Sequence, residues 1–444
     1  MNRIHLSDHF TYGRLARFVL PSIVMMVFTS IYGVVDGFFV SNFVGKTAFA
    51  AVNLVYPISM VFSAAGFMIG TGGSAIIGKT LGEGRGEEAN RYFSMLTAVV
   101  AAAGAVLAGA GILVLRPASA LLGAEGRLLE DCVLYGRVLL AALPCFMLQT
   151  AFQSFFITAE KPTLGLAVTV ASGLTNMVFD ALLVAVLPMG LLGAALATVL
   201  SQAVGAAVPL VYFALPNDSL LRLTRSTRLY PKILWKVCTN GSSEMVSNMA
   251  SSLVSLLYNY QLMWLLGENG VAAYGVIMYA GFIFAAIQFG YVMGVGPVVS
   301  FQYGAGNQAE LRNLCRKSLL LTAVSGAAMF FLARAAAGPM GRIFVGYDRE
   351  LMELTVHAFG ICAFAFLING FTTFASAFFT ALNDGAVSAA LSFLRTFVFE
   401  TASILLLPLW LGADGLWWAM PAAEAAGLAA TAIFLVLNQR KYGY

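Results

Sequence analysis

Two aspartates lie deep within long apolar stretches of the first half of the chain. Asp36 follows Tyr32 by one helical turn, and Asp180 follows Asn176 by one turn, so each pair shares a helical face. An acidic group at the centre of a bilayer costs at least about 2.5–3.5 kcal/mol, so such residues usually face a cavity or a partner. Carboxyl groups that share a dry pocket can exchange a proton near neutral pH. We therefore expect Asp36 and Asp180 to bind H⁺ or another ion, and a hydrogen bond between helices is the alternative.

The second half of the chain carries three further acids in apolar stretches, Glu244, Glu400 and Glu424. Arg395 precedes Glu400 by five residues, and this pairing is equally compatible with a structural ion pair and with a functional role. Glu244 and Glu424 could also supply counter-charges for a cationic substrate. These four residues form a possible substrate or cation site in the second half.

The elements that must carry these residues are transmembrane helices. Of the 444 residues, 60% are hydrophobic and 10% are charged, whereas soluble domains have about 45–50% apolar and about 25% charged residues. This composition excludes a cytosolic enzyme, a nucleic-acid-binding protein and a disordered chain. Since a spanning helix needs about 20 apolar residues, we predict an all-α polytopic membrane protein. The twelve predicted spans are 18–41, 48–77, 92–115, 131–158, 163–187, 191–215, 235–266, 270–303, 314–337, 353–381, 386–409 and 413–437.

An internal repeat divides the spans into two sets of six. Residues 66–72 match 290–296 at an offset of 224, and 150–159 match 372–381 at an offset of 222. An even number of helices per repeat gives both halves the same orientation, and a substrate cavity is then expected between them near the midplane. The predicted domains are an N-terminal six-helix bundle over 1–215, a basic cytoplasmic linker over 216–234 and a C-terminal six-helix bundle over 235–444.

The distribution of basic residues predicts the orientation. Most of the 25 Lys and Arg residues lie at the ends of spans on the side of the two termini, which predicts that both termini are cytoplasmic. We expect a multi-pass protein of the inner (cytoplasmic) membrane. The net charge of +4, the five scattered cysteines and the three histidines indicate no nucleic-acid partner, metal site or cofactor. The phosphate-loop pattern at 73–80 ends an apolar helix, so we dismiss nucleotide binding.

Prolines and glycines predict how the helices bend and pack. Pro21 lies fifteen residues before Asp36, so the helix that carries this acid can bend. We also expect Pro57, Pro144 and Pro297 to interrupt their spans. The Gly-x-x-x-Gly spacings at 66 and 70 and at 290 and 294 should let neighbouring helices approach closely.

Together these features resemble the multidrug and toxic compound extrusion (MATE) family over nearly the whole chain. The segments that carry the resemblance are 36–45 and 297–306, beside the arrangement of twelve spans in two halves. The resemblance implies that Pro21 is the bending proline of helix 1 and that Glu244 is the acid of helix 7 that some members use for cation coupling. It also implies a protonation site made of Tyr32, Asp36, Asn176, Asp180 and Thr198.

The sequence departs from the family pattern in helix 10. Some members pair the acid of helix 7 with a carboxylate there, whereas residues 357–383 contain none, and Asn369 is the nearest polar candidate. This departure disfavours a sodium site in the second half and favours the cluster in the first half. It does not decide whether the coupling ion is H⁺ or Na⁺.

The resemblance implies a secondary active antiporter, and not an enzyme, that exports amphipathic, often cationic organic compounds by alternating access. We expect it to need no cofactor beyond the coupling ion and to function in the lipid bilayer as a monomer. The alternative is a flippase for lipid-linked saccharides, which would be expected to hold several arginines in its cavity, whereas Arg137 and Arg395 are the two within spans. His357 alone cannot supply the site of an integral-membrane enzyme.

Overall fold

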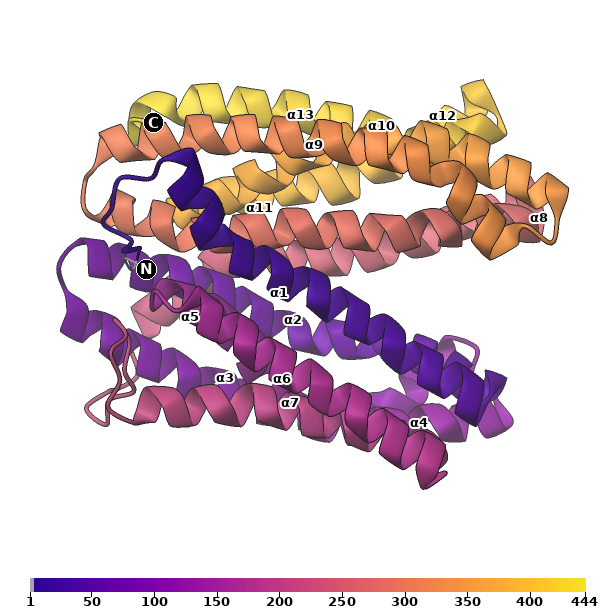
Figure 1. Cartoon of the computed structure of the whole chain (residues 1–444), viewed down its shortest axis with the longest axis horizontal. Coiled ribbons are helices and arrows are strands. Elements are labelled where there is room, and N and C mark those ends of the chain that lie inside the picture. Colours follow the sequence, from indigo (N-terminus) through magenta and orange to yellow (C-terminus); the bar gives the residue numbers. More distant parts are fainter. Residues whose placement is uncertain (1–3) are drawn as a thin grey trace.

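The computed structural model describes residues 4–444, and within them every regular element is a helix. The first bundle contains a set of helices joined by short loops (Figure 1). These are α1 (Tyr12–Phe39), α2 (Lys46–Gly82), α3 (Gly86–Leu121), α4 (Gly126–Ala141), α5 (Leu143–Thr158), α6 (Pro162–Asp180) and α7 (Gly190–Ala214). Short π-helical segments, Val40–Val44 and Ala181–Val186, continue α1 and α6.

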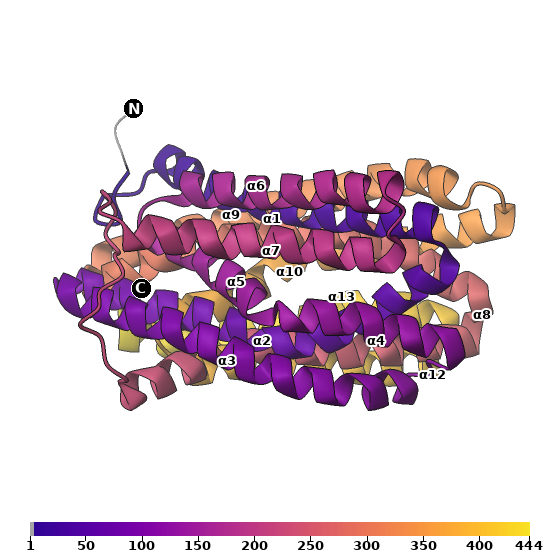
Figure 2. The same ribbon diagram turned by 90° about the horizontal axis from the view of Figure 1, so that it is seen from below.

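The second bundle follows a linker that contains no helix. Its helices are α8 (Pro231–Gly304), α9 (Gln308–Val345), α10 (Arg349–Ala381), α11 (Gly385–Phe393), α12 (Glu400–Leu411) and α13 (Ala413–Tyr442). A π-helical segment, Leu394–Phe399, joins α11 to α12. Figure 2 gives the same arrangement from below, with the two bundles overlapping.

The 74 residues of α8 are two helices folded back on each other. Gly267 has φ of +64°, a value that favours glycine, and it breaks the helical backbone at this point. The rings of Tyr258 and Tyr274 stack with their centroids 4.5 Å apart, whereas sixteen residues of straight helix would separate them by about 24 Å. Since α4 and α5 are also the two arms of one bent element, the described residues contain twelve helical segments long and apolar enough to cross a membrane, the number predicted.

The effect of the prolines differs from the prediction at two of three positions. Pro144 lies in the first turn of α5, directly after a bend of 54° from α4, as expected. Pro57 and Pro297, by contrast, lie inside continuous helices, so the prediction that they interrupt their spans is wrong. A proline removes a single backbone hydrogen bond, and packing against neighbouring helices can keep the rest of the helix intact.

Glycines set the closest helix contacts, as the spacing predicted. A Cβ atom at Gly70 would lie 3.0 Å from Cα of Ala151, so α2 approaches the backbone of α5. A Cβ atom at Gly290 would lie 2.5 Å from Cα of Ile23, which places α8 equally close to α1. These contacts leave no room for a side chain larger than hydrogen.

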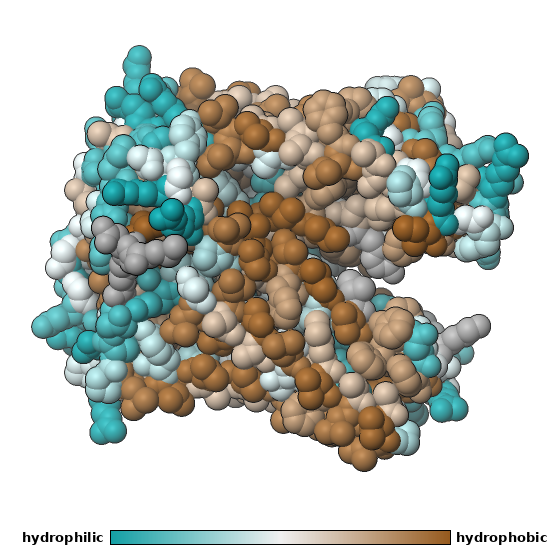
Figure 3. Space-filling view, viewed as in Figure 1, coloured by the Kyte–Doolittle hydropathy of each residue, from teal (hydrophilic) through white to brown (hydrophobic). Residues whose placement is uncertain are grey.

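The two bundles meet at one end of the molecule and diverge at the other. Both termini lie at the closed end, on the left of Figure 1. There a methyl group at Gly72 would overlap the carbonyl of Val237, and one at Gly304 would overlap the carbonyl of Lys79, so α2 and α8 are in backbone contact. Figure 3 shows a hollow between the bundles that opens at the opposite end.

The surface has the polarity of a membrane protein. Figure 3 shows a broad hydrophobic band across the middle of the molecule and hydrophilic residues at both ends. Large apolar side chains such as Leu113 and Trp264 are 81% and 74% exposed, which a soluble surface of this extent would not tolerate. The chain is therefore a multi-pass membrane protein.

Candidate ion and substrate sites

The structure brings together the polar cluster predicted in the first bundle. The Asp36 side chain, on the last turn of α1, lies beside Asp180 and Asn176 of α6 and Thr198 of α7. Asp180 is fully buried and Asn176 is 2% exposed, whereas Asp36 is half-buried. Three helices thus contribute the predicted residues to one site.

Local sequence explains how α1 reaches α6 at this point. A Cβ atom at Gly173 would lie 2.5 Å from the ring of Phe28 and 2.9 Å from that of Tyr32, so the absence of a side chain admits both rings of α1. Asp180 directly precedes one π-helical segment, and Asp36 lies four residues before the other. Such segments are frequent at functional sites because they displace side chains from the regular helical register.

The cluster contains buried oxygen atoms that lack a well-formed hydrogen bond. Oδ1 of Asp36, Oδ1 of Asn176 and both carboxylate oxygens of Asp180 are buried without a partner of good geometry. Within residues 4–444, neither aspartate forms an ion pair with a lysine or arginine. Buried carboxylates need a compensating charge or a proton, so this arrangement can bind H⁺ or a small cation.

Two tyrosines complete the cluster, and one of them was not predicted. Tyr32 lies one turn before Asp36 and is close enough for the two groups to interact electrostatically, as the spacing indicated. Tyr135 of α4 is 4% exposed and lies beside Thr198, Asp36 and Asp180. Sequence reasoning missed it because the position of Tyr135 in the chain carries no information about which helices face α4. A buried tyrosine usually needs a hydrogen-bond partner for its hydroxyl group, and this requirement was the available signal.

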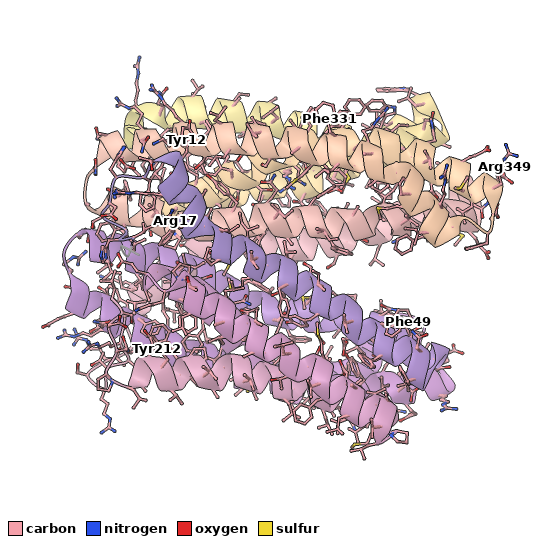
Figure 4. All side chains as sticks on the ribbon, viewed as in Figure 1. Tyr12, Arg17, Phe49, Tyr212, Phe331 and Arg349 are labelled. Carbon is pink, nitrogen blue, oxygen red and sulfur yellow. The ribbon has the colours of Figure 1, made fainter. Side chains whose placement is uncertain are left out.

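Pro21 lies inside α1, which continues from Tyr12 to Phe39 without a break in the helical backbone. Figure 4 labels Tyr12 and Arg17 on the first turns of this helix, at the closed end of the molecule. The helix therefore connects the closed end to the Asp36 cluster, with Pro21 between them. The bending role of Pro21 stays a prediction.

In the second bundle, the arginine pairs with a different acid from the one suggested by spacing. Nη2 of Arg395 lies 3.0 Å from Oε1 of Glu424, and Nε lies 3.1 Å from the same oxygen. Thr372 donates a hydrogen bond of 2.9 Å to the other oxygen of Glu424. The structural ion pair of Arg395 is therefore with Glu424 of α13 and not with Glu400, and Thr372 of α10 helps to hold Glu424.

Asn369, the polar candidate in helix 10, belongs to the same network. Its Oδ1 accepts a hydrogen bond of 3.1 Å from Thr373, and Thr373 in turn accepts one of 3.3 Å from Nη1 of Arg395. The amide therefore contributes to the arginine network as a neutral group.

The carboxyl groups of Glu244 and Glu400 remain without a hydrogen bond or an ion pair within the described part of the chain. Both are half-buried, and both lie near enough to Arg395 to feel its charge. Glu244 also lines a cavity of about 50 Å³ between the bundles, together with Ser74 and Thr380. Three carboxylates around one guanidinium leave an excess of negative charge that can attract a cation.

The remaining motif has no ligand-binding geometry. Residues 73–80 form part of the continuous helix α2 and not a loop between a strand and a helix. Their backbone amides are used within the helix, so they are not available to a phosphate group.

Comparison with known proteins identifies the family. The sequence profile of the MatE family matches residues 21–182 and 245–404 of this chain, one stretch in each bundle. The chain belongs to the MATE family. Members of this family are membrane transporters, so the expectation that the protein is not an enzyme is confirmed.

Relatives of this MATE protein match over nearly its whole length. The multidrug export protein MepA of Staphylococcus aureus is 22% identical over 440 residues, which is 96% of this chain and 94% of the relative. MepA of Staphylococcus saprophyticus is 21% identical over 438 residues, with the same coverage. These relatives and the family match do not favour the lipid-linked saccharide flippase.

Solved structures share the fold of this MATE protein. One is described as the outward-facing conformation of a multidrug resistance MATE family transporter; its TM-score is 0.90 at 20% identity, over 96% of this chain and 95% of that chain. A transporter from Pyrococcus furiosus, whose description reports a binding pocket of reversed polarity, gives a TM-score of 0.88 at 21% identity with the same coverage. The predicted fold class is therefore confirmed.

Proposed function

We propose that this MATE protein is a secondary active antiporter that exports amphipathic, cationic organic compounds in exchange for H⁺ or Na⁺. The observation that carries the proposal is the pair of carboxylates, Asp36 and Asp180, placed side by side within a helix bundle with no cation of their own in the described residues. The similarity of the chain to multidrug export proteins supports the choice of substrates.

The coupling ion binds at the cluster of Asp36, Asp180, Asn176, Tyr32 and Thr198. An arriving proton or sodium ion neutralises repulsion between the two carboxylates and draws their oxygens together. Because Asp36 lies on α1 and Asp180 on α6, this change moves one helix against the other. Pro21 gives α1 a point at which it can bend as it responds.

The substrate binds between the bundles, where Glu244 and Glu400 supply negative charge. Arg395 and Glu424 neutralise each other there, and their pair holds α13 in place. A cationic substrate is therefore attracted by the carboxylates of Glu244 and Glu400, and not by that of Glu424, which is paired with Arg395. Release follows when the bundles rock and expose the cavity to the other side.

The membrane potential supplies part of the driving force. Each net positive charge that moves inward across about 100 mV contributes about 2.3 kcal/mol, which sustains about a fiftyfold concentration ratio of exported compound. Exchange of one H⁺ or Na⁺ for one monovalent cation moves no net charge and draws on the concentration gradient of the ion alone. We place the protein in the inner membrane as a monomer, with both termini in the cytoplasm.

The test is gradient-driven transport of a fluorescent organic cation by protein reconstituted in liposomes. The parent protein should move the dye when a pH gradient or a Na⁺ gradient is imposed, and comparison of the two gradients identifies the coupling ion. Asp36→Asn should lose gradient-driven movement, because the amide removes the negative charge that the coupling ion neutralises.

Glu130→Gln is the matched control, since Glu130 is an exposed acid of α4 whose side chain is 63% accessible. This variant should transport as the parent does. Dye movement by Asp36→Asn at the parent's rate would refute the role of Asp36. Dye movement by the parent without any ion gradient would refute antiport.

A further inference from the structure

The chain segment before α1 crosses from one bundle to the other at the closed end. This N-terminal strap, residues 4–11, is held by two glutamates that belong to different bundles. Glu160 lies in the loop between α5 and α6, and Glu310 lies in the first turn of α9. Both glutamates are buried, with 8% and 5% of the residue exposed.

The two glutamates contact the strap in the same way. One oxygen of Glu160 accepts the backbone N–H of Leu6 at 2.7 Å, and the other lies 2.8 Å from Nδ1 of His5. One oxygen of Glu310 accepts the backbone N–H of Phe10 at 2.9 Å, and the other lies 2.6 Å from Nδ1 of His9. A carboxylate cannot donate, so each imidazole donates its proton in these contacts.

Further bonds fix the strap to the second bundle. Gln302 of α8 donates a hydrogen bond of 2.7 Å to the carbonyl of Leu6, and Lys317 of α9 donates one of 2.6 Å to that of Phe10. The side chains of Leu6 and Phe10 are fully buried in the apolar core that contains Val298 and Leu314. The strap is thus part of the second bundle, and Glu160 attaches the first bundle to it.

The backbone at Glu160 indicates a specific requirement for this side chain. Its φ is +59°, in the left-handed region, which is unfavourable for residues other than glycine and asparagine. At the corresponding turn of the second bundle the residue with positive φ is Asn383, which tolerates this conformation better. The unfavourable backbone conformation of Glu160 is offset by the hydrogen bonds that its carboxylate forms with the strap.

The strap is also connected directly to the ion site. It leads into α1 at Thr11, and the unbroken helix carries Asp36 near its other end. A displacement of α1 that follows ion binding therefore pulls on the strap. Tyr12, labelled in Figure 4, lies at the junction, with Nζ of Lys317 5.2 Å from its ring centroid.

We propose that the N-terminal strap is a latch that holds the closed end of the transporter shut, with His5 and His9 setting its strength through Glu160 and Glu310. The end that bears both termini can open only when Glu160 releases the strap, since this glutamate belongs to the first bundle and the strap to the second. The proposal rests on the alternating access of the proposed function.

Protonation of the imidazoles strengthens the latch. A neutral histidine already donates Nδ1–H to its glutamate, and a positive charge adds an ionic attraction to that bond. Among the described residues, the other charged groups near His5 are Asp8, which accepts its backbone N–H, and Lys161, which is paired with Asp218. Around His9 they are Arg14, which donates to its carbonyl, and Lys317. A lower pH on the side of the two termini should therefore favour the state in which this end of the transporter is shut.

The test measures the opening of this end by double electron–electron resonance in lipid nanodiscs. Spin labels replace Glu87 of α3 and Arg316 of α9, which are exposed on different bundles near the closed end, and the native cysteines are replaced by alanine. In the double variant Glu160→Gln with Glu310→Gln, the long-distance population should rise several-fold over the parent. His5→Asn with His9→Asn should act in the same direction and should weaken the response of the distance populations to acid.

His357→Asn is the matched control. Nε2 of His357 lies 3.0 Å from Oδ1 of Asp414, but both residues belong to the second bundle, so this contact cannot join the bundles. The variant should leave the distance populations unchanged. If a double variant fails to fold, the single variants Glu160→Gln and Glu310→Gln replace it and should each give part of the effect.

The outcomes separate the latch from the proposed function. If the parent alternates between two distances and the folded glutamate and histidine variants keep its populations, the latch is refuted while alternating access stands. If the parent keeps one distance at every pH and with or without dye, alternating access is refuted, and the latch with it.

Discussion

Buried acids in the two bundles differ in what neutralises them. Glu424 has Arg395 and Thr372 as partners, and its side chain is 8% exposed. Asp180 is fully buried beside a second aspartate and has no lysine or arginine partner in the described residues. The first arrangement is satisfied within the protein and so is suited to a structural role. The second is unsatisfied, and so it needs an ion from outside.

The ion pair of Arg395 should therefore contribute to stability. Glu424→Gln leaves the guanidinium, whose side chain is 25% exposed, without its counter-charge, and we expect the variant to lose about 1–3 kcal/mol of unfolding free energy. Thermal unfolding in detergent measures this loss. Glu353→Gln, which breaks an exposed pair with Arg349, is the control and should cost less than about 1 kcal/mol. Equal melting temperatures for the two variants would contradict the structural role.

The contacts of Asp384, in the loop between α10 and α11, indicate that the stability of the folded protein depends on pH. Burial acts to raise its pKa, but hydrogen bonds from Lys441 and Tyr442 outweigh this effect and hold the pKa below its ordinary value. A carboxyl group with a lowered pKa stabilises the folded state above its ordinary pKa, and this contribution is lost as the pH falls through the lowered value.

Asp384→Asn should therefore melt at a lower temperature than the parent near neutral pH. The difference should shrink as the pH falls below about 4, the ordinary pKa range of aspartate. Melting temperatures of both proteins, measured from neutral to acid pH, provide the test. A difference that stays constant across this range would rule out the ionic contribution of Asp384.

Sequence reasoning predicted individual site residues where a polar group breaks an apolar run. Asp36, Asp180 and Asn176 stand out in this way, and the structure places them together. The partner of Arg395 could not be predicted, because Glu424 lies in a different helix and spacing along the chain carries no information about facing helices. Tyr135 was missed for the same reason.

At the scale of the helices, glycine determines how closely elements of different bundles approach. Gly72 of α2 and Gly241 of α8 face each other at the closed end, where a methyl group on Gly241 would overlap the carbonyl of Met68. The spacing of glycines in the sequence predicted the close contacts at Gly70 and Gly290. The contact of Gly72 with Gly241 was not predicted, since Gly241 has no second glycine four residues away in the chain.

Gly241→Ala should weaken the contact between α2 and α8. A methyl group forced against backbone atoms typically costs about 1–3 kcal/mol, so we expect a lower melting temperature for the variant. Gly109→Ala is the matched control because a Cβ atom at Gly109 meets nothing within 4 Å. In an exposed helical position, alanine should stabilise by up to about 1 kcal/mol relative to glycine. Unchanged stability of Gly241→Ala would mean that the two helices can separate freely.

The whole molecule consists of two bundles that each contain an apolar core, and a third apolar cluster joins them at the closed end, where Leu15 and Phe18 of α1 pack with Val298 of α8. In the first bundle, Phe93 packs against Phe213 with ring centroids 5.0 Å apart, inside a core that extends from α2 to α7. In the second, Trp417 and Phe359 lie in a core of α8, α10 and α13. The internal repeat predicted two halves, but a repeat cannot predict which end is open, because one sequence populates several states.

Because an apolar core joins helices within each bundle, we expect the bundles to move as rigid bodies. Spin labels at Leu121 and Tyr347, which are 89% and 83% exposed at the open end, should report a shorter distance whenever labels at the closed end report a longer one. Asp36→Asn should shift both distances together, since the ion site lies on the helix that contacts both bundles. Labels at Glu87 and Leu215, within the first bundle, are the control and should keep one distance throughout. A change in this control distance that accompanies opening would show that the first bundle deforms, and the description of two rigid bodies would then fail.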